Sequence, residues 1–181
     1  MSREITFTVG VIAEKRAAAS RWAAEYWIPV GVTLAPLDRA AGEVLLQDER
    51  ATRYYMGSAE ITCYAADMEA YVENFDSGTP AVYVVIRQDL EDTGPLPWYV
   101  QCVTVSPHEA QDYEVGASDL VERVTMPPEI EEAVRAFMAE HYKPQEFRKR
   151  KRNEVRPEEQ LFGKEPIFSV RPRRPEDETD G

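Results

Sequence analysis

The amino-acid sequence predicts an α+β fold with a mainly antiparallel sheet, about three short-to-medium helices and a disordered C-terminal tail. Most strand-like segments follow one another without an intervening helix, and this order favours antiparallel pairing. Helical periodicity is limited to three segments. After residue 142 the periodicity ends. We therefore expect a single acidic α+β domain over residues 1–142, followed at 143–181 by a basic and then acidic tail in an extended or disordered state.

The first half of the predicted domain is mostly strand. Ile5–Ile12 alternates in polarity and places Phe7 and Val9 on one face. Arg16–Trp27 is ambiguous, because its alanines favour a helix whereas a helix would place Trp22 and Trp27 about 140° apart. Further strands are predicted at Ile28–Leu34, Glu43–Gln47, Thr52–Met56 and Ala59–Ala65, with a two-residue hairpin turn at Gly57-Ser58 between the last two.

The second half of the domain alternates between helices and strands. Asp67 is the predicted N-cap of a first helix, in which Met68, Tyr71 and Phe75 recur at helical spacing. The run Ala81–Arg87 is apolar on both of its faces, and this predicts a strand at the centre of a sheet. Two more strands are predicted at Trp98–Val105 and Leu120–Thr125.

Two later helices have clear start signals. Ser106 and Glu109 form a capping box, in which the Ser106 hydroxyl accepts from a helical amide and Glu109 reaches back, with Pro107 at the first helical position. The longest helix is predicted to run from Pro127-Pro128 to about Tyr142. Its buried stripe comprises Ile130, Val134, Phe137 and Met138.

The sequence carries no signature of a catalytic residue, a metal site or a cofactor, and we predict none of them. The nearest metal motif is His108-Glu109-Ala110-Gln111-Asp112, where Asp replaces the second His of H-E-x-x-H and a third ligand is missing. A thiol nucleophile made by Cys102 with His108 is a weaker hypothesis, because the valines around Cys102 indicate burial. Cys63 and Cys102 are expected to be reduced, buried and inert.

Charge is divided unevenly along the chain. The net charge is −12, yet residues 1–142 contain 10 basic and 24 acidic side chains whereas residues 143–174 contain 11 and 5. An acidic domain repels nucleic acids and anionic lipids, so we do not expect the domain to bind them. Three interpretations stay open for the basic block, namely a phosphate or nucleic-acid contact, docking on an acidic protein face, or a solvated tail. The block consists of Arg148, Lys149, Arg150, Lys151 and Arg152.

Two tryptophans precede the segment Ile28-Pro29-Val30. Trp22 and Trp27 either pack in the core or act as aromatic contacts for a partner. Together with the basic block, they are the predicted partner-binding residues. The sequence has no apolar run of about 18 residues, and its N-terminus is acidic where a signal peptide is basic. A cytoplasmic location without membrane contact is therefore expected.

Several segments recur together, in the same order, in one bacterial family. They are Arg21-Trp22, Trp27-Ile28-Pro29-Val30, Glu69-Ala70-Tyr71, Pro80–Arg87, Val105–Tyr113, Val121–Pro127 and Phe147–Arg152. On these motifs the chain resembles the family defined by domain of unknown function 3305, over residues 5–152. Members of that family are proteobacterial and lack an assigned activity, and their genes tend to lie near those of formate dehydrogenase subunits and other molybdenum enzymes.

The resemblance implies an accessory role. Some family members are labelled as molybdopterin guanylyltransferases, but Thr6–Lys15 contains only Gly10 where such an enzyme needs a glycine-rich nucleotide loop. We therefore hypothesise an accessory or assembly protein that acts by protein–protein interaction, with formate dehydrogenase or its maturation machinery as the candidate partner. The alternative is a cofactor-handling protein or small enzyme whose residues Arg148–Arg152 hold a phosphate-bearing ligand such as a molybdopterin nucleotide.

Overall fold

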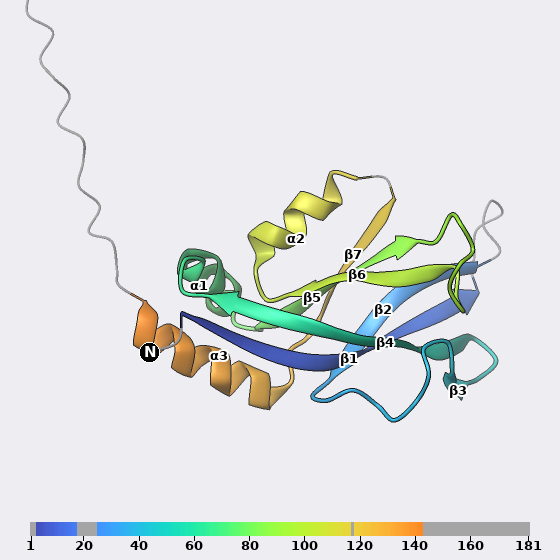
Figure 1. Cartoon of the computed structure of the whole chain (residues 1–181), viewed down its shortest axis with the longest axis horizontal. Coiled ribbons are helices and arrows are strands. Elements are labelled where there is room, and N and C mark those ends of the chain that lie inside the picture. Colours follow the sequence, from blue (N-terminus) through green and yellow to red (C-terminus); the bar gives the residue numbers. More distant parts are fainter. Residues whose placement is uncertain (1–2, 18–24, 117, 143–181) are drawn as a thin grey trace, which may run out of the picture. The chain divides into compact units, whose positions relative to one another are not determined.

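The computed structural model of the chain describes residues 3–17, 25–116 and 118–142 (Figure 1). The chain divides into two units, Met1–Lys143 and Pro144–Gly181, and the described residues all belong to the first. The predicted tail at 143–181 lies outside the described residues. The described part contains the strands β1 (Glu4–Ala17), β2 (Glu25–Thr33), β3 (Val44–Gln47), β4 (Ala51–Tyr64), β5 (Ala81–Gln88), β6 (Trp98–Thr104) and β7 (Asp119–Thr125), and the helices α1 (Met68–Asp76), α2 (Pro107–Glu114) and α3 (Pro128–His141).

The predicted α+β class with antiparallel pairing and three helices is confirmed. The strands form two sheets, in the orders β2-β1-β4-β3 and β6-β5-β7, and every pairing is antiparallel. Because β4 lies near β6 and β2 lies near β7, the two sheets surround one apolar core. Figure 1 shows α2 and α3 on opposite sides of the strands. No helix in the described residues has the length and apolar character that a membrane crossing requires.

The central position predicted for β5 is confirmed. Val82, Val84 and Ile86 of this strand lie in the main core between the sheets. Val85 is also fully buried but lies outside that core, on the side where α2 packs with its buried Ala110. A strand buried on both faces needs apolar residues at consecutive positions, which explains the unbroken apolar run in the sequence.

The predicted hairpin turn at Gly57-Ser58 is wrong, because β4 continues through it as one strand. Val11 of β1 lies opposite Gly57 and Ile12 lies opposite Tyr55, so Met56 is an extra residue in a β-bulge. Gly57 has a φ of +104°, a conformation that glycine adopts without a steric penalty. The glycine therefore bends a long strand and does not reverse the chain.

The ambiguous segment Arg16–Trp27 belongs to strands wherever it is described. β1 extends to Ala17 and β2 begins at Glu25, with the two paired antiparallel. Pro29 lies inside β2 next to a second bulge, where the register shifts between Ile12 and Ala13. A proline is tolerated there because β2 is the last strand of its sheet and needs no amide donor on its open side.

The helix starts follow the predictions only in part. The Ser106 hydroxyl accepts from the Glu109 amide at 3.2 Å, as predicted. The amide of Ser106 is bonded to Thr104 Oγ1 at 3.0 Å, so the reach-back bond predicted for Glu109 is not made. Asp67 occupies the N-cap position of α1 but makes no capping hydrogen bond with its side chain. The predicted stripe of α3 is confirmed, with Ile130, Val134 and Phe137 buried and Met138 partly buried.

A buried asparagine joins α1 to the sheet below it. The Asn74 side-chain amide donates to the carbonyl oxygens of Ala81 and Val105, both at 2.8 Å. Its own oxygen accepts from the Ala81 amide at 3.0 Å. Asn74 thus satisfies three buried backbone groups, two of Ala81 at the start of β5 and one of Val105 just after β6.

Candidate functional site

The predicted partner-binding residues are mostly outside the described part of the chain. Trp22 lies in the gap at 18–24, and Arg148–Arg152 lies beyond residue 142. Trp27 is described, and it is partly buried on β2, packed against the apolar core. Its ring centroid is 5.0 Å from that of Tyr54. The position of Trp27 favours core packing over an exposed aromatic contact.

The metal and thiol hypotheses find no support in the local geometry. His108 Nε2 lies 2.8 Å from Glu73 Oε2 of α1, so its hydrogen-bond partner is a carboxylate and not the Cys102 thiol. The Cys102 thiol instead donates to Glu109 Oε1 at 3.7 Å. Burial, reinforced by the negative charge of Glu109, raises the pKa of Cys102 to about 11, so its thiol stays protonated at neutral pH. Within the described ranges no group of His, Cys, Asp and Glu is arranged to hold a metal ion.

A mixed surface on the four-stranded sheet was not predicted from the sequence. Antiparallel register places Tyr26 of β2 beside Arg16 of β1. Two residue pairs further along, on the same face, the register defines a row that crosses the whole sheet, since directly opposed residues share a face. The row runs Ile28, Glu14, Arg53 and Leu46, from β2 through β1 and β4 to β3. We call these six residues the outer sheet face.

A buried carboxylate organises the outer sheet face. Only 6% of the Glu14 side chain is exposed, and its two oxygens are taken by different arginines. Arg16 Nε donates to Oε2 at 2.6 Å, and Arg53 Nε donates to Oε1 at 2.5 Å. The hydrogen bond from Arg53 and that from Arg16 lower the pKa of Glu14, against the opposing effect of burial. Glu14 is therefore ionised at neutral pH and holds both guanidinium groups in place.

The two arginines remain half exposed while their inner nitrogens are bound. Their side-chain exposures are 39% for Arg16 and 49% for Arg53. Tyr26 and Leu46 flank them with 43% and 51% of their surface exposed. Tyr and Arg are enriched among residues that dominate protein–protein binding energy, especially beside apolar side chains. One carboxylate against two guanidinium groups also leaves a net positive charge on this face.

The sequence contained one signal for this face. Glu14 and Arg16 continue the alternation of Ile5–Ile12, with charged residues on the side of β1 away from the core. That signal becomes visible only when β1 is extended past Ile12. The partners Arg53 and Leu46 are brought to the same row by two bulges, which no local pattern in the sequence specifies.

Comparison with known protein families gives a match that spans nearly all of the described fold. A family model described as protein of unknown function (DUF3305) matches residues 8–151, from within β1 to beyond α3. No curated protein and no solved structure matches the chain. The match covers most of the 181 residues and includes the outer sheet face. The chain therefore belongs to the DUF3305 family of proteins of unknown function.

Proposed function

We propose that this protein is a cytoplasmic accessory protein that binds another protein through the outer sheet face. The observation that carries the proposal is the pair Arg16 and Arg53, which a buried Glu14 holds in place between the exposed Tyr26 and Leu46. Side chains that are already ordered lose little conformational entropy on binding. β1 is paired on both sides, so the backbone beneath these residues is also well supported.

The chemistry of the face defines the partner that it fits. The uncompensated guanidinium charge favours a partner surface that presents carboxylates, and Tyr26, Ile28 and Leu46 favour apolar side chains beside them. The domain as a whole is acidic, with 24 acidic against 10 basic side chains in residues 1–142. An acidic partner would be repelled elsewhere on the domain, which would direct it to this face.

The candidate partner is formate dehydrogenase or its maturation machinery. This assignment rests on the family resemblance and on no described residue. In the same proposal, Trp22 and the basic block Arg148–Arg152 would add contacts outside the outer sheet face. These contributions stay predictions, because the residues lie outside the described ranges.

A pull-down from native extract of formate-grown cells tests the proposal. Tagged full-length protein is compared with Leu46→Glu, which places a negative charge where carboxylates are expected to bind. Leu90→Glu is the matched control, since Leu90 is 80% exposed, lies on the β5–β6 loop of the other sheet and is not one of the six residues of the outer sheet face. We expect Leu46→Glu to retain about tenfold less partner, equivalent to about 1.4 kcal/mol, and Leu90→Glu to retain it fully.

Two results would contradict this proposal. Equal recovery by the Leu46 and Leu90 variants would remove the outer sheet face as the binding surface. Recovery of no dehydrogenase or maturation protein above the untagged control would remove the proposed partner. A truncation ending at Tyr142 measures the contribution of residues 143–181 separately. If the truncated protein is folded but no longer captures the partner, the docking element lies in those residues.

A further inference from the structure

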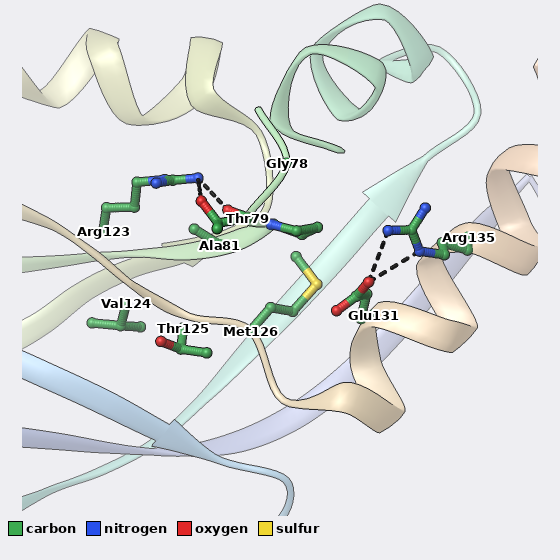
Figure 2. Close-up of a pocket in the computed structure, with 10 residues that line it drawn as sticks. Gly78, Thr79, Ala81, Arg123, Val124, Thr125, Met126, Glu131 and Arg135 are labelled. Atoms are coloured by element: carbon green, nitrogen blue, oxygen red, sulfur yellow. Dashed lines mark hydrogen bonds and ion pairs between the residues drawn. The ribbon is translucent and has the colours of Figure 1, made fainter. Parts of the chain in front are cut away.

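A pocket of about 430 Å³ lies away from the outer sheet face (Figure 2). Three segments line it, namely the α1–β5 connection at Gly78–Ala81, the end of β7 at Arg123–Met126, and the first turns of α3 with Glu131 and Arg135. Its volume is within the range of small-molecule sites. Figure 2 shows Arg123 on one side, the Glu131–Arg135 pair on the other and Met126 between them.

Arg123 is held in this pocket by neutral oxygens alone. Its Nη2 donates to Ser77 Oγ at 2.9 Å, to Thr79 Oγ1 at 3.3 Å and to the Thr79 carbonyl oxygen. No carboxylate of the described residues forms an ion pair with it. By contrast, five other arginines of the described part each lie within 3.3 Å of a carboxylate. These are Arg16, Arg39, Arg53, Arg87 and Arg135.

This mode of attachment leaves both charge and donors unused. A single nitrogen of Arg123 takes all three of its bonds, so Nε and Nη1 have no acceptor among the described residues. A guanidinium group presents its donors in a planar fork that matches the two oxygens of a carboxylate or a phosphate. Among the described arginines whose side chains make hydrogen bonds, Arg123 alone is oriented without a carboxylate.

Arg135 is a second positive group at the opposite wall. Its Nε and Nη2 both donate to Glu131 Oε1, at 3.0 and 2.8 Å, and its guanidinium carbon lies 4.7 Å from the centroid of the Phe75 ring. Stacking and pairing together fix its orientation. Two guanidinium groups against the one carboxylate of Glu131 give the pocket a net positive charge.

We propose that this pocket binds the oxyanion group, carboxylate or phosphate, of a small molecule, with Arg123 as the principal donor and Arg135 as the second. Val124 and Met126 are buried at the wall and offer apolar contact to the rest of such a molecule. The inference goes beyond the proposed protein-binding function, because it uses neither Glu14 nor any other residue of the outer sheet face.

Side-chain NMR of the full-length protein tests the pocket directly. The arginine Nε–Hε resonances are followed while inorganic phosphate or, in a second arm, succinate is added at constant ionic strength set with sodium chloride. We expect the Arg123 resonance to shift with saturation in at least one arm. Saturation with phosphate alone would assign a phosphate ligand, and saturation with succinate alone would assign a carboxylate ligand.

Matched variants distinguish binding at this pocket from non-specific attraction of anions to any positive charge. Arg123→Gln is expected to weaken binding at least tenfold, whereas Arg50→Gln removes an equal charge from the β3–β4 turn and is expected to leave it unchanged. Arg123→Lys keeps the charge and loses the fork, so intermediate binding at an unchanged Tm would show that the loss in Arg123→Gln is not a folding defect. Absence of saturation in both arms, or equal weakening by Arg50→Gln, would overturn the proposal.

Discussion

Two buried polar side chains, Asn74 and Glu14, stabilise different parts of the molecule in different ways. Asn74 is 2% exposed, and its side chain bonds only to backbone groups of Ala81 in β5 and Val105 just after β6. Glu14 is similarly buried, with 4% of the whole residue exposed, but its partners are the side chains of two arginines that reach into solvent. The neutral amide joins elements of the fold, whereas the carboxylate positions a surface. Burial alone therefore does not distinguish a structural role from a functional one, and the identity of the partner does.

The largest effect is expected from removing the neutral side chain. Asn74→Ala leaves three buried backbone groups without partners, each of which costs about 1–3 kcal/mol. We expect the free energy of unfolding, measured by urea denaturation, to fall by about 3–5 kcal/mol. Gln47→Ala is the control, because it removes an exposed amide from β3. A loss as small as that of the control would show that water replaces the amide at no cost.

A smaller effect is expected from neutralising the carboxylate. Glu14→Gln keeps the shape of the side chain but leaves one acceptor oxygen for two arginines. One charge-assisted pair becomes an ordinary hydrogen bond and the other is lost, because the new NH2 group faces a guanidinium donor, although Arg16 and Arg53 can still be hydrated. We expect a loss of about 2 kcal/mol in the free energy of unfolding. The same variant should weaken partner capture through the outer sheet face, whereas a destabilised but folded Asn74→Ala protein should not. If Glu14→Gln and Asn74→Ala both lost partner capture, the distinction between a surface-positioning role for Glu14 and a purely structural role for Asn74 would be wrong.

The pH dependence sharpens the contrast further. The pKa of Glu14 is lowered below its ordinary value of 4.5, chiefly by the hydrogen bond from Arg53. Its contribution to stability is therefore fully present above pH 4.5 and is lost as the pH falls through the folded-state pKa. We expect the stability difference between wild type and Glu14→Gln to shrink in urea denaturation below pH 4.5, while the difference between wild type and Asn74→Ala stays constant. A constant difference for Glu14→Gln would contradict the lowered pKa.

Features set by neighbouring residues were predictable from the sequence. The apolar run of β5, the stripe of α3 and the hydrogen bond from the Glu109 amide to Ser106 Oγ each depend on side chains a few positions apart, or on burial of both faces of one strand. The predicted bond from Glu109 back to the Ser106 amide was wrong, and the cause is again a neighbouring residue. Thr104, two residues before Ser106, supplied a nearer acceptor than Glu109.

Features that depend on register were not predictable. Gly57 is equally suited to a turn and to a bulge, because both need a positive φ, and only the pairing of β4 with β1 decides between them. The same pairing brings Arg53 to Glu14, 39 positions earlier in the chain. Likewise, the connection after α1 brings Thr79 to Arg123.

The sequence by itself determined the class of the fold, its central strand, its three helices and the acidic character of residues 1–142. These properties follow from composition and from periodicity over a few turns or strand pairs, which act locally. The tertiary structure alone decided which charges are paired. It gave Glu14 two arginines and left Arg123 with neutral oxygens, because an ion pair forms only where register and packing bring distant side chains within hydrogen-bonding distance.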